Sequence, residues 1–404
     1  MPLYREHLAQ ELEQKKSEFT GTIGEDAVED FQDAAETLGS ELSKAELEEK
    51  LSDLERPGAL PTNEFDQTNG LAIPLEESAE WNSHEAVNRW ARNQIENVTT
   101  VAADGSQIDP VDVFEKPVGL AQAVWIANKH TPTGEYEEDV RLEVLTPEDL
   151  LFENPNTGFV QVDSEEVPTT RFELEMRVLE EQIKQRSGED APPVVFYDGS
   201  LILSFTQLLD QRTQERYGEA LARGLAASKH HGVPVVGYIS GSKATELGKM
   251  IQQLGLVDTP QSVRDYQIVA ELLDNWGDRT LLFQSRRDAT LDQLRATYHG
   301  VEYDFSEDIL FTYLKTDSGP QIDRIEMPSW ILDEGLVEHV CSVIRAEAGV
   351  GRGYPEILQA VDTDAVISHQ DREEFLRLFQ DFAEEHDLDL DWNNKALSKK
   401  RRRR

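Results

Sequence analysis

Cysteine is almost absent from this chain, since Cys341 is the single one in 404 residues. One cysteine cannot form a disulfide within the chain, and it excludes a metal centre built from several thiolates. Long apolar runs are missing as well: no stretch of 18 consecutive apolar residues occurs, so the sequence predicts no membrane-spanning segment. The first residues also lack the apolar stretch of a signal peptide, and we therefore expect the protein to stay in the cytoplasm.

Basic residues are few for a chain of this length. The sequence has 79 acidic against 39 basic residues, a formal net charge of -40. At low salt so acidic a chain repels DNA, which by itself argues against a nucleic-acid partner. Proteins that work in molar salt also carry acidic surfaces, and at 1 M ionic strength the Debye length is only about 3 Å. Because the excess acid extends along the whole chain, we interpret it as a halophilic surface; an ordinary acidic cytoplasmic protein is the alternative.

The apolar residues that are present predict a folded α/β protein. They make up 38% of the chain and include six tryptophans, a content typical of globular proteins. From about residue 80 the patterns give three strands, a helix, a strand, a helix and a strand, an order that predicts a partly antiparallel sheet flanked by helices. The expected strands cover 98–103, 118–127, 140–145, 194–203, 233–239, 280–284, 309–314 and 322–327. The expected helices cover 84–97, 169–184, 216–227, 333–347, 355–367 and 371–386.

Residues 1–60 predict a helical arm that precedes this domain. Apolar side chains recur there mostly at helical steps among Glu, Gln and Lys, with interruptions by glycine. The arm is either solvated or a docking element for dimerisation or for another partner. Turn residues between Arg56 and Asn63 predict a boundary, so we expect a linker over 61–79 and the α/β domain over 80–404.

Two Asp-Gly-Ser sequences stand out because each begins within or directly after an apolar, β-rich run. Asp104 follows the run 98–103, and Asp198 lies inside the run 194–203. An acid at the end of a buried strand needs a reason, since an uncompensated buried charge costs several kcal/mol. One Asp-Gly-Ser is ordinary turn chemistry. Two in the same context favour a site in which the strands hold both carboxylates rigidly.

A third acid lies on the helix expected between the two aspartates. Glu175 points along the inward face of this helix, whereas Glu173 lies off it; the alternative is that Glu175 is a flanking surface residue. Oxygen ligands from three elements favour Mg²⁺ or Mn²⁺, and two such ions activate water and stabilise the leaving oxygen in phosphodiester hydrolysis. The inward face is defined by Phe172, Met176, Leu179 and Ile183.

Together these motifs resemble a known family. An Asp on the first strand, a Glu on the following helix and an Asp on the fourth strand are similar to the layout of RNase H-like nucleases. The two Asp-Gly-Ser sequences more specifically resemble the archaeal NurA nucleases, and the Gly-Tyr-Pro that opens 353–362 resembles that family's closing Tyr-Pro helix. The resemblance covers roughly residues 80–385. It implies a dimeric, manganese-dependent exonuclease and endonuclease that works with the hexameric HerA translocase in DNA end resection.

The resemblance also implies roles for individual residues. Asp104, Glu175 and Asp198 would be ligands for Mn²⁺ or Mg²⁺, and Tyr354 would lie beside the site. The family usually has a His eight residues after that Tyr. This chain has Asp362 there, which can bind a hard metal ion but cannot act as an imidazole.

Two of these assignments stay open. Asp364 competes with Asp362, because each shares a helix face with apolar residues. Glu173 competes with Glu175, because the insertion 185–193 lengthens the spacing to the second Asp-Gly-Ser sequence.

Other features carry weaker signals. The nine histidines show no metal-ligand spacing, and His230-His231 predicts a polar helix end. The basic run 399–404 is either a solvated tail or a contact for DNA or a partner. The alternative to a nuclease is a catalytically silent scaffold of the same fold that binds a translocase ring.

Overall fold

The computed structural model describes residues 4–15, 25–76, 81, 83–110, 116–153, 158–287, 293–317, 319 and 321–388. The basic run 399–404 therefore lies outside the described residues. The strands are β1 (Gly58–Pro61), β2 (Ala72–Ile73), β3 (Thr100–Ile108), β4 (Gly119–Asn128), β5 (Tyr136–Leu145), β6 (Leu151–Glu153), β7 (Val160–Val162), β8 (Val194–Asp198), β9 (Val235–Ile239), β10 (Arg279–Thr280), β11 (Phe283–Arg286), β12 (Arg295–Tyr298), β13 (Val301–Asp304), β14 (Ile309–Leu314) and β15 (Asp323–Pro328). The helices are α1 (Arg5–Gln14), α3 (Glu25–Glu41), α4 (Lys44–Leu51), α5 (His84–Ile95), α6 (Pro147–Leu150), α7 (Glu166–Arg186), α8 (Gln211–His231), α9 (Glu246–Gln253), α10 (Asp265–Val269), α11 (Trp330–Asp333), α12 (Val337–Val350), α13 (Glu356–Ala365) and α14 (His369–Glu385), with 3-10 helices η1 (Asn63–Asp66) and η3 (Ser204–Leu208).

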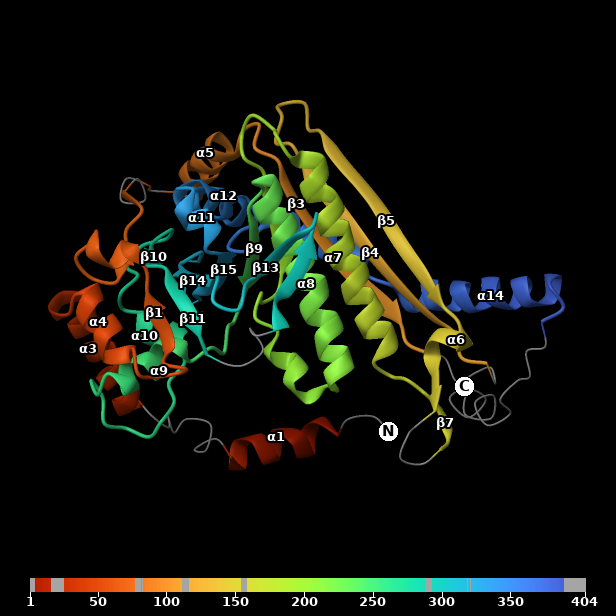
Figure 1. Cartoon of the computed structure of the whole chain (residues 1–404), viewed down its shortest axis with the longest axis horizontal. Coiled ribbons are helices and arrows are strands. Elements are labelled where there is room, and N and C mark those ends of the chain that lie inside the picture. Colours follow the sequence, from red (N-terminus) through yellow and green to blue (C-terminus); the bar gives the residue numbers. More distant parts are fainter. Residues whose placement is uncertain are drawn as a thin grey trace.

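One 11-stranded mixed sheet runs through the molecule (Figure 1). Its order is β1-β11-β14-β15-β9-β8-β3-β4-β5, with β2 and β10 paired off this path. At the β5 end, β4 runs antiparallel to β3 and β5, whereas β3, β8 and β9 are mutually parallel. The α/β fold with a mixed, RNase H-like sheet is confirmed.

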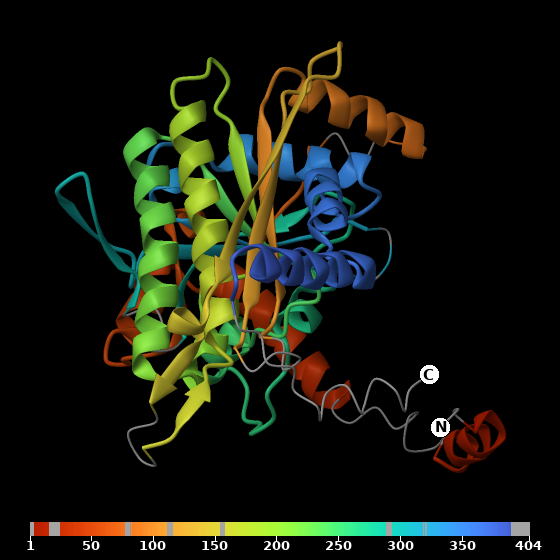
Figure 2. The same cartoon turned by 90° about the vertical axis from the view of Figure 1, so that its right-hand side faces the viewer.

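Helices cover both faces of this sheet, with α7 and α8 on one side and the C-terminal helices on the other (Figure 2). The inward face predicted for α7 is buried, for example at Phe172 (2% exposed) and Ile183 (0%), and it packs on Val101 and Val195. Alternate residues of the same strands, such as Phe196, point to the other side and meet α12 and α13, as the two-residue period of a strand requires. None of the helices in the described ranges is long and apolar enough to cross a bilayer.

The strand predicted over 194–203 is too long. β8 ends at Asp198, because Gly199 takes a φ of 157° and turns the chain out of the sheet. Residues 201–203 are buried in the following loop, which explains their apolar character. No expected element covers α9, α10 or the β12–β13 hairpin.

The first 60 residues do not form a separate arm where the structure describes them. Phe31 and Leu38 of α3 and Leu47 of α4 are fully buried in a core that includes Met250 of α9. Strand β1 pairs antiparallel with β11. From α3 onward, the described part of the apolar stripe packs against the same chain, whereas the apolar side chains of α1, such as Leu8 and Leu12, are exposed.

The linker predicted over 61–79 is likewise built into the core in its described part. Glu64 of η1 accepts two hydrogen bonds from the guanidinium of Arg279 on β10, at 3.0 and 2.7 Å. The backbone N–H of Leu282 donates to the same carboxylate at 2.7 Å. Arg279 is 1% exposed, and its buried charge is compensated by Glu64 together with Glu338, whose carboxylate accepts from Nε at 3.1 Å. Because Glu64 and Arg279 are far apart in the sequence, no local pattern reveals their contact. The turn residues of this segment, taken alone, predict a linker.

Replacing Glu64 with Gln should therefore destabilise the fold by roughly 3 kcal/mol, because it leaves a buried guanidinium without its bidentate carboxylate. Urea denaturation at fixed salt measures the effect. The matched control is Glu55→Gln, which removes an acid that is 86% exposed in its pair with Arg56 and should cost less than about 1 kcal/mol. Equal losses in the two variants would show that the buried pair does not anchor this segment.

Candidate active site

Asp104 and Asp198 lie side by side on neighbouring parallel strands. The register pairs Ala103 of β3 with Tyr197 of β8, and the next residue on each strand is one of the two aspartates. Desolvation raises the pKa of both carboxyl groups, and the charge of Asp198 further raises the pKa of Asp104. The pairing of β3 with β8 thus fixes two carboxylates at one point of the sheet.

Asp104 lies within its strand, not at the strand end that the sequence predicts. β3 continues to Ile108, and the glycine that follows Asp104 makes room for α7 without turning the chain. A Cβ at Gly105 would lie 2.8 Å from Cγ of Arg171 and 3.1 Å from Oε2 of Glu175. The Gly105 N–H donates to the Asp104 carboxylate at 2.8 Å, and its carbonyl accepts from Arg171 at 3.0 Å. The first Asp-Gly-Ser sequence is a site of close helix approach.

Glu175 reaches the two aspartates from α7. Its side chain is buried, with 4% of the residue exposed. Desolvation raises its pKa to about 8; Arg171, at 3.6 Å, opposes the shift, and the charges of Asp104 and Asp198 add to it. A buried acid that senses both aspartates belongs to the same electrostatic cluster.

Glu173, the alternative to Glu175, faces away from this cluster. Both of its carboxylate oxygens accept from the guanidinium of Arg216 on α8, at 2.7 and 2.8 Å. Arg216 also donates to Glu166 at 2.8 Å. Glu173 therefore serves the contact between α7 and α8.

Tyr354 and Asp362 approach from the C-terminal side. The Tyr354 hydroxyl donates a hydrogen bond to the Asp198 carboxylate, which partly offsets the rise in the pKa of Asp198, while the charge of Asp362 adds to that rise. Asp362 of α13 also raises the pKa of Asp104. Both Asp362 and its alternative, Asp364, are exposed. Asp362 is the one whose charge acts on both strand aspartates.

The serine of the first Asp-Gly-Ser sequence holds α13 in place. The Ser106 hydroxyl donates to the carbonyl of Ala365, the last residue of α13, at 2.5 Å. Gln122 of β4 donates to the same carbonyl at 3.1 Å. At the other end of the helix, the Ile357 N–H donates to the buried carboxylate of Glu347 at 3.0 Å. With both ends anchored, α13 carries Asp362 to the edge of the cluster.

The second Asp-Gly-Ser sequence works as a turn. The hydroxyl of Ser200 and the N–H of Leu201 donate to Glu326 of β15 at 2.8 and 2.7 Å. The turn fits closely against β9, because a Cβ at Gly237 would lie 2.6 Å from the Gly199 carbonyl oxygen. These contacts fix the backbone directly after Asp198.

The chemistry of this donor set suits a hard divalent cation. Asp104, Glu175, Asp198 and Asp362 offer only oxygen atoms, the ligands preferred by Mg²⁺ and Mn²⁺. Within the described ranges, however, no three of these carboxylates have ligand atoms that all lie within 4.8 Å of one another. The two exposed aspartates, 198 and 362, have room to rotate toward an ion.

A different group does meet that spacing, and the sequence did not reveal it. His230 and His231, at the end of α8, have ring nitrogens within 4.8 Å of those of His299. His299 lies in the turn of the β12–β13 hairpin, far away in the sequence, and the adjacent histidines of α8 were the sole local signal.

The raised pKa of Glu175 predicts a pH-dependent stability in the metal-free protein. Burial favours the protonated acid, so the cost of ionising it appears as the pH rises above its unfolded value of 4.5 and is complete above the folded value of about 8. Glu175→Gln, which stays neutral, should gain stability relative to the parent across this window, by up to about 1.4 kcal/mol for each pH unit. Urea titrations in EDTA from about pH 4.5 to 8.5 measure the difference. A difference that is constant with pH would place the ionised Glu175 in water.

Comparison with known proteins identifies the family. The NurA domain family matches residues 98–367, well over half of the chain. No curated protein matches it. Among solved structures, the catalytic domain of human endonuclease V is 14% identical, with 76% of this chain and 99% of that chain covered and a TM-score of 0.33. A crystal structure of NurA is 11% identical, with 71% and 89% covered and a TM-score of 0.34. These scores are too low to support any statement about the site, and it is the family match that shows that the chain belongs to the NurA domain family of nucleases.

Proposed function

We propose that this protein is a metal-dependent deoxyribonuclease that hydrolyses phosphodiester bonds. The observation that carries the proposal is the cluster of Asp104 on β3, Asp198 on β8, Glu175 on α7 and Asp362 on α13. In this cluster the pKa values of Asp104, Glu175 and Asp198 are raised, first by desolvation and then by the charges of neighbouring acids. Like charges held together in a partly desolvated site are unfavourable without a cation. The oxygen donor set favours Mn²⁺ or Mg²⁺ as that cation.

A pair of such ions, if held by these carboxylates, would supply an activated water and stabilise the leaving oxygen. The protein's own part is to position the ligands. Asp104 and Asp198 are held by the strand register, and the Gly105 N–H and the Tyr354 hydroxyl each occupy one acceptor site and leave others free to bind an ion. Glu175, beside Arg171, supplies the buried ligand. Asp362, which is exposed on α13, would supply a further ligand from the C-terminal side.

We further propose that the protein acts in the cytoplasm as an exonuclease and endonuclease, in double-strand-break end resection with a HerA-type hexameric translocase. Membership of the NurA domain family supports this assignment. Most of the expected docking arm is not available for a partner, because α3 and α4 are part of the core. Helix α1 and its N-cap residue Tyr4 still offer exposed apolar side chains for a contact with the translocase ring, namely those of Tyr4, Leu8 and Leu12.

A homodimer is the proposed assembly. β5 ends the sheet, and alternate residues Val140, Leu142 and Val144 on it are 41%, 61% and 45% exposed. They lie on the face opposite the one at which Arg141 meets α7 through Glu181. An exposed apolar edge strand is a surface that proteins usually cover, and a second copy would cover it.

Asp104→Ala and Asp198→Ala should each abolish metal-dependent DNA cleavage without unfolding the protein, because each removes a ligand of the same ion pair. Cleavage of linear duplex and single-stranded DNA with Mn²⁺ in high salt tests this, with circular dichroism and thermal melting alongside. Glu173→Gln is the matched control and should keep at least about a third of the parent rate, since Glu173 pairs with Arg216 outside the cluster. If a folded aspartate variant cleaves DNA at the parent rate, that aspartate is not part of the site. If the parent protein itself does not cleave DNA, the catalytically silent scaffold is favoured.

The acidic surface predicts that folding and cleavage both need salt near molar levels. At about 0.1 M salt the screening length is about 10 Å, so surface carboxylates repel one another and the DNA. Ordinary DNA-binding proteins show the opposite trend and lose affinity as salt rises. Cleavage and circular dichroism measured from about 0.1 to 3 M KCl separate the two trends. Full folding and maximal activity at about 0.1 M would refute the halophilic interpretation.

A further inference from the structure

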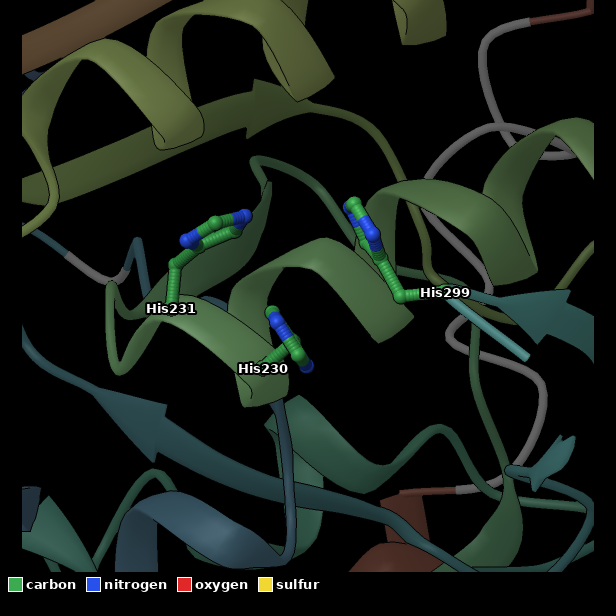
Figure 3. A group of neighbouring side chains, drawn as sticks. All are labelled: His230, His231 and His299. Carbon is green, nitrogen blue, oxygen red and sulfur yellow. The ribbon is translucent and has the colours of Figure 1, made fainter. Parts of the chain in front are cut away.

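Three histidines gather where the last turn of α8 meets the β12–β13 hairpin (Figure 3). One ring nitrogen from each histidine forms a group in which all three atoms lie within 4.8 Å of one another. The rings of His230 and His231 have centroids 4.9 Å apart, and those of His230 and His299 are 5.1 Å apart. The exposed rings of His230 and His299 have freedom to adjust. In tetrahedral zinc sites, with Zn–N distances near 2.1 Å, ligand nitrogens lie about 3.4 Å apart. The rings must rotate to bring three nitrogens onto one ion, because those of His230 and His299 are stacked at an interplanar angle of 11° and those of His231 and His299 have centroids 6.5 Å apart.

Tyrosine hydroxyls next to the group hold two of the rings by one nitrogen each. Nε2 of His231 lies 3.3 Å from the hydroxyl of Tyr298, and Nδ1 of His230 lies 3.5 Å from that of Tyr303. The second nitrogen of each ring is a potential metal ligand. Ligating histidines usually have such a partner on the second nitrogen, which fixes the ring's orientation and tautomer.

The surroundings also suit a cation. His230 and His231 lie in the last turn of α8, where the helix dipole favours positive charge. Lys184 of α7 lies 5.5 Å from the Tyr298 ring centroid, but it is paired with Glu180 at 2.6 Å.

We propose that His230, His231 and His299 form a second metal site, which binds Zn²⁺ or a similar imidazole-preferring divalent transition ion and clamps the β12–β13 hairpin onto α8. Three protein nitrogens leave the fourth tetrahedral position to water. A bound ion would also stabilise the packing of the hairpin, because Tyr298, directly before His299, is 3% exposed and belongs to the core between α7 and α8.

This site is distinct from the carboxylate cluster in place and in chemistry. Glu175 lies about 16 Å before the end of α7, along a helix that rises 1.5 Å per residue. The histidine group lies beyond that end, where the Ser187 hydroxyl donates to the His231 carbonyl at 3.4 Å. Imidazole nitrogens favour zinc, cobalt, nickel or copper, whereas carboxylates favour magnesium and manganese.

The test uses the full chain in excess Mg²⁺, which fills the oxygen site without competing for imidazole. Co²⁺ is titrated in and followed by visible absorbance, since four-coordinate Co²⁺ absorbs far more strongly than the six-coordinate ion in an oxygen site. The parent should bind one Co²⁺ with this strong band, Zn²⁺ should displace it, and Zn²⁺ should raise the melting temperature. His299→Asn should lose the band and bind Co²⁺ at least about tenfold more weakly, because removing even a hydrogen-bond partner of a metal ligand lowers metal affinity by about that factor.

His369→Asn, an exposed histidine on α14 outside the group, is the matched control and should behave like the parent. If His299→Asn does not fold, His230→Asn takes its place, because that side chain is exposed at a helix end. A parent without the band, or a folded variant of either histidine with the parent's band and midpoint, overturns the proposal. Asp104→Ala should keep the band, and His299→Asn should keep Mn²⁺-dependent cleavage, so the two sites succeed or fail separately.

Discussion

Repulsion among carboxylates is the constraint that the centre of this structure must overcome. Four acids approach one another at the sheet, and Arg171 is the cation that opposes the shifted pKa values of Glu175 and Asp104. Left free, such side chains would separate or take up protons, because partial burial weakens screening by water. They stay together because each is attached to a different rigid element, and the cost of their proximity is offset by packing elsewhere in the fold.

The two Asp-Gly-Ser sequences solve this problem in different ways. In the first, Gly105 lets α7 approach so closely that Glu175 reaches the strand, and Ser106 anchors the end of α13. In the second, Gly199 turns the chain, and Ser200 ties the turn to Glu326 on β15. The same three residue types thus fix the distance of a helix in one case and the path of a loop in the other. In both, the aspartate itself is positioned by its strand.

Much of this arrangement could be predicted from the sequence, because its signals are local. Apolar runs mark β3 and β8, and a helical period orients Glu175 inward. What escaped prediction depends on partners far apart in the chain: Glu64 finds Arg279, and His299 finds the end of α8. The predicted end of β3 at Asp104 was wrong for the same reason. The glycine after Asp104 is required by the close approach of α7, and the sequence of the strand alone does not show that approach.

The charge of the whole chain acquires a specific meaning at this centre. A net charge of -40 repels a polyanion, and the clustered acids repel it most where cleavage is proposed. Two divalent ions would bring four positive charges to that point and balance the four carboxylates, because bound ions are often the largest charges in a site. Salt screens the distant surface within a few ångströms, but it acts much less on charges that are partly buried. Under the proposed function, phosphate binding therefore depends on metal loading more than on basic side chains, and an acidic surface is compatible with a DNA substrate.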